Sequence, residues 1–157
     1  MKTQLEQFDL LINGQIVPST DRNYFESINP SNGEAFANVA DANVEDARLA
    51  IQSARTAFDN QSWSGLTIAE RGRYLTDIAK LVREHAKELA MLESLDTGKT
   101  SKQTTFIDVP TCADTFEYFG KLTKELSGKI NPVPAAVKSM TEYDPIGVVG
   151  CIIPWNY

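Results

Sequence analysis

Residues 147–157 read GVVGCIIPWNY, and our interpretation of the whole chain starts from this stretch. Its first seven residues are almost all apolar, rich in β-branched side chains and without a helical period. This pattern predicts a short strand buried on both faces. Pro154 ends the run, because a central strand cannot lose a backbone N–H. Trp155 and Asn156 would then lie at the carboxyl end of the strand, where open α/β sheets bind ligands.

Length, composition and charge are those of an ordinary folded chain. It has 157 residues, 42% hydrophobic content and a net charge of −6. The acidic balance argues against nucleic acid or a membrane surface as a partner, and no apolar run is long enough to span a bilayer. The first residues contain no apolar signal segment, and Cys112 and Cys151 lack metal-ligand spacing. We therefore expect a reduced, cytoplasmic setting.

The N-terminal part has the pattern of short strands joined by turns. Two apolar runs flank Asn13 and Gly14, the strongest short-range signal for a β-hairpin. Residues 24–28 and 34–39 are further strand candidates, and the Asn-Pro-Ser-Asn-Gly sequence between them predicts a turn.

A first helix is predicted over residues 43–58. Asn43 can cap its N-terminus, and Glu45 and Asp46 place negative charge in the first turn, where the helix dipole favours it. Its apolar residues recur at helical spacing, so one face of this helix should be buried.

The next helical region runs to Leu95. Thr67 and Glu70 have the spacing of a capping box at its start, and we expect a bend near His85. Gly98 suits a left-handed position after the last turn and should end the helix.

A further helix should begin near Asp108, with Pro110 in its first turn, and end at Gly128. Residues 131–134 predict a rigid connector, and residues 139–143 an exposed strand. Amphipathic helices and edge strands thus accompany one buried strand that lacks parallel neighbours. The expected fold class is α/β, as the front part of a larger α/β protein.

The order and spacing of several sequence blocks resemble the N-terminal portion of the NAD(P)-dependent aldehyde dehydrogenase superfamily. The betaine-aldehyde and broad-specificity branches are the most similar. Pro-Trp-Asn after an apolar strand is the most specific mark. The blocks are LINGQIV, SINPSNGEAFANVADAN, ARTAFD, WSGLTIAERGRYL, LESLDTGKT, EYFGKL and YDPIGVVGCIIPWNY.

This resemblance implies an organisation for the chain. Residues 1–128 would supply helices and edge strands around an incomplete doubly wound parallel sheet, the NAD-binding domain. Residues 129–146 would begin the arm that joins subunits into a homo-oligomer. Residues 147–157 would form the first strand of the dinucleotide-binding sheet, with the catalytic domain absent.

The resemblance also implies the activity and part of its site. Family members oxidise an aldehyde to a carboxylic acid with NAD or NADP. Asn156 matches the asparagine whose amide donates to the developing oxyanion; the residues alone would suggest a turn cap instead. Ile153, Pro154 and Trp155 match the segment that lines the cofactor, although Trp155 could equally be an ordinary half-buried aromatic residue.

A monovalent-cation site, for K⁺ or Na⁺, is implied at Asp108 together with the backbone of Ser27 and Ile28. Carboxylate and carbonyl oxygens are the ligands that such a cation prefers. The alternative is that Asp108 is simply the N-cap of the helix that follows it.

Four other residues that could carry chemistry have structural interpretations. We expect Cys151 and Cys112 to be core cysteines, since neither matches the family nucleophile. His85, the only histidine, should lie on a helix surface, and Lys99 should be solvated.

The family's catalytic cysteine, glutamate base, cofactor-gripping lysine and glycine-containing cofactor loop have no counterpart in this sequence. We therefore expect the chain alone to be inactive, to bind NAD poorly, and to be aggregation-prone or partly disordered from about Asn131. Two alternatives to an enzyme fragment remain. One is a short non-catalytic module that pairs with a full-length relative, and the other is a small helical binding domain.

Overall fold

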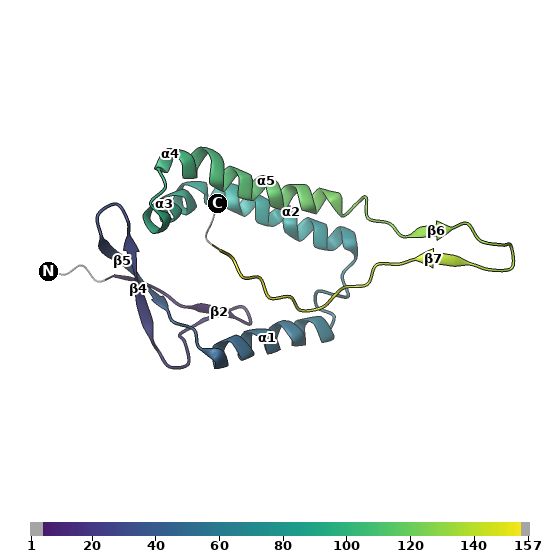
Figure 1. The fold of residues 1–157 in the computed structure, drawn as a ribbon, viewed down its shortest axis with the longest axis horizontal. Coiled ribbons are helices and arrows are strands. Elements are labelled where there is room, and N and C mark those ends of the chain that lie inside the picture. Colours follow the sequence, from purple (N-terminus) through teal and green to yellow (C-terminus); the bar gives the residue numbers. More distant parts are fainter. Residues whose placement is uncertain (1–4, 155–157) are drawn as a thin grey trace.

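The computed structural model describes residues 5–154. Figure 1 shows the helix at residues 44–59 apart from the other helices, which lie together, with short strands between and beside them. The strands are β1 (Glu6–Phe8), β2 (Leu10–Ile12), β3 (Gln15–Val17), β4 (Tyr24–Asn29), β5 (Glu34–Ala40), β6 (Lys129–Asn131) and β7 (Ser139–Thr141). The helices are α1 (Val44–Asp59), α2 (Ile68–Glu84), α3 (Ala86–Thr97), α4 (Ser101–Gln103), the π-helix η1 (Thr104–Asp108) and α5 (Val109–Leu122).

The strands form three small sheets. The largest has the order β1-β5-β4, with β1 parallel and β4 antiparallel to β5. β2 and β3 form the predicted hairpin, and both turn residues have positive φ, 54° at Asn13 and 72° at Gly14. This confirms the turn prediction, because a two-residue type I′ hairpin turn needs the left-handed conformation at both of its central residues.

The predicted helix starts are confirmed in detail. The Asn43 side chain accepts hydrogen bonds from the backbone N–H groups of Glu45 and Asp46, and the Asp46 carboxylate accepts one from the backbone N–H of Asn43, which completes a capping box. Thr67 and Glu70 form the second capping box. Each box satisfies backbone N–H groups that the first turn of a helix leaves without partners.

The helical region after Thr67 contains the expected bend. α2 ends at Glu84, α3 begins at Ala86, and exposed His85 lies between them, 3.3 Å from Glu88. Gly98 follows α3 with a φ of 75°, as predicted for a left-handed stop. The chain then passes through α4 and the π-turn η1 into α5, which ends at Leu122 rather than at Gly128.

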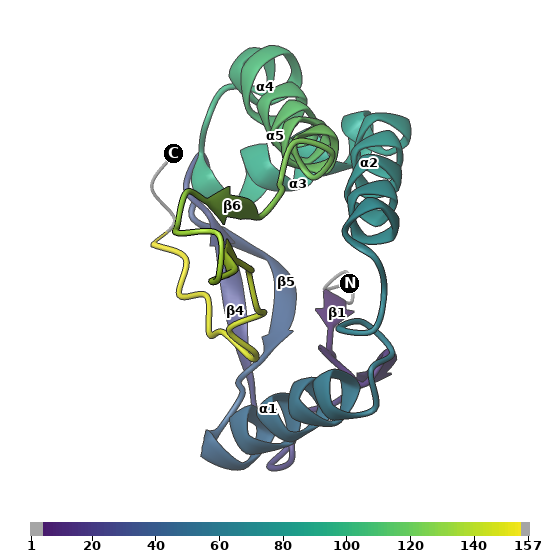
Figure 2. The ribbon, with the colours of Figure 1, turned by 90° about the vertical axis from the view of Figure 1, so that its right-hand side faces the viewer.

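α2 and α5 pack closely at two glycines. A methyl group at Gly120 would stand 2.8 Å from the backbone oxygen of Gly72, closer than real contacts allow. The two helices therefore approach each other backbone to backbone. Figure 2 shows α2, α3 and α5 together towards one end of the β4–β5 pair, with α1 at the opposite end.

The predicted connector after α5 is part of a hairpin. β6 and β7 pair antiparallel, Ile130 opposite Met140, and this ribbon extends away from the helices (Figure 1). The strand at residues 139–143 is confirmed for Ser139–Thr141, whereas its partner β6 was not expected from the sequence.

The strand predicted at residues 147–153 does not form among the described residues. The chain there carries no strand pairing, and Val149 and Ile152 are 64% and 98% exposed. The buried core cysteine expected at Cys151 is wrong for the same reason, because that residue is exposed. A strand of this type is stable only between neighbouring strands, and the described residues provide none beside it.

The buried core of the described residues is small. Val44 and Ile51, two large apolar residues on α1, are 69% and 60% exposed. The apolar face predicted for this helix is therefore exposed to solvent among the described residues. The buried apolar residues are Ala37, Ala40, Ala79, Ala90, Val109 and Ala113.

Candidate functional site

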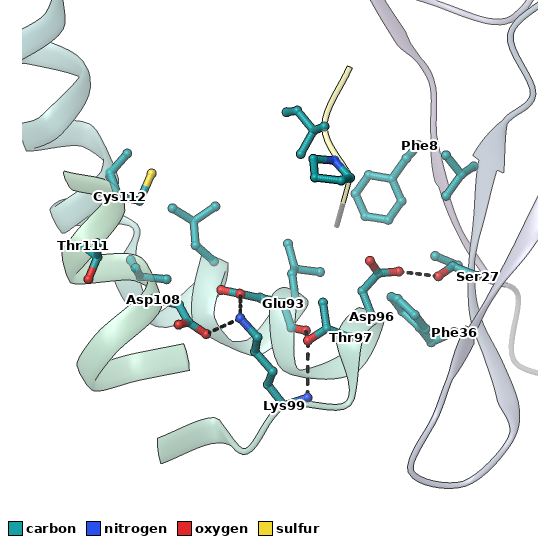
Figure 3. Close-up of a pocket in the computed structure, with 18 of the residues that line it drawn as sticks. Phe8, Ser27, Phe36, Glu93, Asp96, Thr97, Lys99, Asp108, Thr111 and Cys112 are labelled. Carbon is teal, nitrogen blue, oxygen red and sulfur yellow. Dashed lines mark hydrogen bonds and ion pairs between the residues drawn. The ribbon is translucent and has the colours of Figure 1, made fainter. Parts of the chain in front are cut away.

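A cavity of about 950 Å³ lies between the β1-β5-β4 sheet, α3 and α5. Phe8 and Val39 line it from the sheet, Leu89 from α3, Phe116 from α5, and Pro154 from the last described segment. Most of its lining side chains are apolar, and polar groups gather at one end (Figure 3). This is the composition expected of a binding cavity: an apolar body with a few convergent polar groups.

The polar end is built around Lys99. Its ammonium donates to Asp108 Oδ2 at 2.9 Å and to Glu93 Oε1 at 3.3 Å (Figure 3). The Lys99 side chain is 18% exposed and that of Asp108 only 3%. The expectation that Lys99 is solvated is therefore wrong, because the turn at Gly98 directs the chain back along α3 towards these carboxylates.

The two carboxylates also control the protonation of this lysine. The hydrogen bond to Asp108, followed by that to Glu93, raises the pKa of Lys99 despite its partial burial. Lys99 is thus a permanent cation at neutral pH. Asp108 Oδ1 is buried and has no hydrogen-bond partner among the described residues.

Asp108 occupies the N-cap position of α5, as the alternative interpretation expected, but its side chain does not cap the helix. It is the last residue of η1, in a helical conformation, and its side chain makes no capping hydrogen bond to α5. The π-turn continues into α5 without a break. Pro110 does lie in the first turn of α5, as predicted.

A second carboxylate lies beside Ser27. Ser27 Oγ donates to Asp96 Oδ1 at 2.6 Å, which joins β4 to the end of α3 (Figure 3). Asp108 faces Lys99 instead, although both Ser27 and Asp108 line the cavity. Sequence reasoning missed Asp96; its position two residues before Gly98, in a helical last turn that meets β4, was the available signal.

Cys112 is exposed and lines the cavity from α5, so the prediction of a core cysteine is wrong there too. It lies one turn after Asp108, which places it on the cavity face of α5 rather than under a covering element. Of the predicted cofactor-lining residues, Ile153 and Pro154 line the cavity. Trp155 and Asn156 lie outside the described residues.

Residues 5–154 contain neither a cluster of metal ligands nor a membrane-spanning helix. No three acidic, histidine or cysteine side chains there come close enough together to hold a metal ion. No helix in that range combines the length and the apolar character that crossing a bilayer requires.

Comparison with known proteins gives consistent matches. A family model described as "Aldehyde dehydrogenase family" matches residues 16–157. The chain is 41% identical over 150 residues to betaine aldehyde dehydrogenase of Bacillus subtilis (strain 168), covering 94% of this chain and 30% of that protein.

Two solved structures extend the comparison to the fold. The apo form of an indole-3-acetaldehyde dehydrogenase superposes with a TM-score of 0.92 at 32% identity, covering 99% of this chain and 35% of that one. PnpE in complex with nicotinamide adenine dinucleotide gives a TM-score of 0.77 at 36% identity, covering 82% and 26%. The chain spans about 30% of the length of the curated relatives it matches.

Proposed function

Because the chain belongs to the aldehyde dehydrogenase family, we propose that it is the N-terminal portion of an enzyme that oxidises an aldehyde to a carboxylic acid with NAD or NADP. One observation carries this proposal. The family match covers residues 16–157 of this chain, yet the chain spans about 30% of its relatives' length. A solved relative holds nicotinamide adenine dinucleotide, which supports NAD as the cofactor.

The residues of this chain fit only part of such a cofactor. Ile153 and Pro154 offer an apolar surface beside the cavity, suited to a nicotinamide ring. The polar end holds Glu93, Asp96 and Asp108 against the single ammonium of Lys99. This excess of negative charge repels a pyrophosphate, which basic groups and backbone N–H groups would have to bind. The proposal therefore includes weak cofactor binding and no turnover by this chain alone.

Asn156 is the residue of this chain that we propose to act in the reaction. Its side-chain amide would donate a hydrogen bond to the aldehyde oxygen, where negative charge develops in the transition state. A bound nicotinamide cofactor would supply the hydride acceptor. The role of this chain is then to hold one preorganised donor and an apolar cofactor surface in place.

The test uses the complete enzyme, with NADH formation as the readout. Asn156→Ala should lower kcat by about 10²–10³-fold, the usual effect of removing one oxyanion donor, with a smaller change in KM. Cys151→Ser is the matched control and should keep full activity, because we assign that thiol no part in the chemistry. An active Asn156→Ala enzyme would contradict the assignment of Asn156. Loss of activity in Cys151→Ser would contradict the control's premise.

We propose a cytoplasmic homo-oligomer joined through the arm at residues 129–146, without nucleic acid or membrane partners. The protruding β6–β7 hairpin supports an arm, because Ile130 and Met140 on it are 89% and 61% exposed. An alkali-metal cation, K⁺ or Na⁺, is proposed near the backbone of Ser27 and Ile28.

A second candidate function is a non-catalytic module that pairs with a full-length relative. The same exposed hairpin favours it, because a ribbon with apolar side chains and free edges can pair with another chain. Mixing the chain with a full-length relative separates the candidates. A stable mixed oligomer whose activity follows only its full-length subunits would favour the module.

A further inference from the structure

The chain contains two Asn-Gly sequences whose turns are hydrogen-bonded differently. They are Asn13-Gly14 in the β2–β3 hairpin and Asn32-Gly33 between β4 and β5. All four residues are exposed, and the two glycines have φ values of 72° and 73°. A methyl group added at either glycine would meet nothing within 4 Å. Solvent therefore reaches both turns, and their hydrogen bonds distinguish them.

An Asn-Gly sequence can modify itself by deamidation when the glycine nitrogen reaches the side-chain carboxamide. The glycine N–H loses its proton to solvent, its nitrogen bonds to the asparagine Cγ, and the Cγ–Nδ2 bond breaks as ammonia leaves with a proton from solvent. Water then opens the cyclic imide to aspartate or isoaspartate. Glycine favours the attack because it has no side chain to hinder it. A hydrogen bond that holds either reacting group slows the reaction, because it must break first.

The Asn32 turn is held at both reacting groups. The Gly33 N–H donates to the backbone oxygen of Asn29 at 2.9 Å. The Asn32 side chain donates to Glu34 Oε2 at 3.2 Å and accepts from the Glu34 backbone N–H at 3.0 Å. Attack at Asn32 therefore has to break the bond of its nucleophile and disturb two bonds of its carboxamide.

The Asn13 turn leaves its nucleophile without a hydrogen bond and adds a donor at the carboxamide. The Gly14 N–H has no hydrogen-bond acceptor among the described residues. The Ser53 hydroxyl of α1 donates to Asn13 Oδ1 at 3.4 Å. Negative charge develops on this oxygen as the Gly14 nitrogen adds to Cγ, and a donor there stabilises the charged form more than the neutral amide.

We propose that Asn13 is a self-modification site, at which the Gly14 nitrogen displaces ammonia with the help of the Ser53 hydroxyl, and that the isoaspartate product loosens the β2–β3 hairpin. Isoaspartate carries the backbone through its side chain and adds one carbon to the turn. The two-residue turn fixes the pairing of Ile12 with Gln15, so a longer turn no longer matches that register. This site is independent of the proposed aldehyde oxidation.

The first test compares the two sites within the same molecule. The chain is incubated folded and, in parallel, unfolded in urea, and peptide mapping by mass spectrometry gives the deamidation rate at Asn13 and at Asn32. We expect Asn13 to react at least about 10-fold faster than Asn32 in the folded chain, the effect of one protecting hydrogen bond. In urea the two sites should react at similar rates, because these bonds are lost. Equal rates in the folded chain, or an unchanged ratio in urea, would overturn the proposal.

Variants then test the hydroxyl. Ser53→Ala should slow deamidation at Asn13 by about 3–10-fold, whereas Ser53→Thr, which keeps a hydroxyl, should react as the parent does. An unchanged Asn32 rate in Ser53→Ala shows that this variant is folded. Glu34→Ala is the matched control, since it removes an acceptor of the Asn32 side chain and should speed only Asn32. Faster deamidation of Asn13 in Ser53→Ala would show that Ser53 restrains the side chain, and would overturn its part as a donor.

Hydrogen exchange tests the effect on the hairpin. The isoaspartate form, separated by chromatography, should exchange the amide protons of β2 and β3 at least about 10-fold faster than the unmodified chain. Exchange in β4 should be unchanged and serves as the internal reference. Equal exchange of β2 and β3 in the two forms would overturn the loosening of the hairpin.

Discussion

The ammonium of Lys99 lies 2.9 Å from the carboxylate of Asp108 and joins the turn after α3 to the end of η1. The Asp108 side chain is 3% exposed, so the pair is screened from water far more than the other ion pairs in the described residues. Glu93 adds a second carboxylate from α3. The pair therefore fixes the loop that carries the chain from α3 into α5.

We expect Lys99→Met to lower Tm by roughly 5 °C, because it leaves the buried carboxylate of Asp108 without its partner. Lys80→Met is the matched control. Lys80 lies 2.6 Å from Asp77, but both side chains are more than half exposed, so Tm should change by less than about 1 °C. Thermal unfolding followed by circular dichroism measures both. Equal shifts would show that the Lys99 pair is no more important than a surface pair.

The contact of α2 with α5 gives a second prediction. Gly120→Ala should destabilise the chain by about 1–3 kcal/mol, because the added methyl group meets the backbone oxygen of Gly72 and forces the helices apart. Gly150→Ala should be neutral, because nothing lies within 4 Å of a methyl group there. Urea unfolding of both variants provides the measurement. A Gly120→Ala variant as stable as the parent would show that the close approach of the two helices carries no cost.

The sequence predicted those parts of the fold that depend on local signals. The Asn13–Gly14 turn, the caps at Asn43 and Thr67 and the stop at Gly98 each follow from one or two residues acting on their own backbone. The family itself was also predictable, because long blocks of residues carry it. These features do not depend on contacts with residues that are distant in the sequence.

Features that depend on distant partners were predicted poorly. β1 was missed because its pairing with β5 joins residues about thirty positions apart, at Gln7 and Asn38. The sequence predicts a solvated Lys99, because its partner Asp108 approaches only through the turn into η1. The strand at residues 147–153 was predicted from its composition, but a strand needs neighbours that the described residues do not provide.

Acid should weaken the anchoring of α1 through Asp46. The hydroxyl of Thr20, followed by backbone N–H groups, donates to this buried carboxylate and lowers its pKa. The folded state therefore binds the proton less well than the unfolded state. Its stabilisation is complete above the ordinary aspartate pKa of about 3.9 and is lost as the pH falls through the folded value.

We expect Asp46→Asn to be less stable than the parent at neutral pH and to lose less Tm on acidification. Tm measured from neutral pH to about pH 3 tests this, with Asp41→Asn, outside the capping box, as the control. Parallel acid curves for the parent and Asp46→Asn would exclude Asp46 as a main source of acid sensitivity.

The proposed alkali-metal site gives a prediction that separates two carboxylates. The sequence pointed to Asp108, but the structure places Asp96 beside Ser27 and directs Asp108 towards Lys99. A cation at Asp108 would have to share its carboxylate with an ammonium 2.9 Å away, and the two positive charges would repel each other. Asp96 instead accepts a hydrogen bond from the neutral hydroxyl of Ser27, and we take it as the better cation ligand.

We therefore expect KCl to raise Tm above its value in choline chloride of equal ionic strength, as binding of a cation to the folded state requires. Asp96→Asn should abolish this difference, whereas Asp108→Asn should keep it at a lower overall Tm. A K⁺ effect that persists in Asp96→Asn and is lost in Asp108→Asn would place the site at Asp108. A parent chain whose Tm does not respond to K⁺ or Na⁺ would contradict the cation proposal.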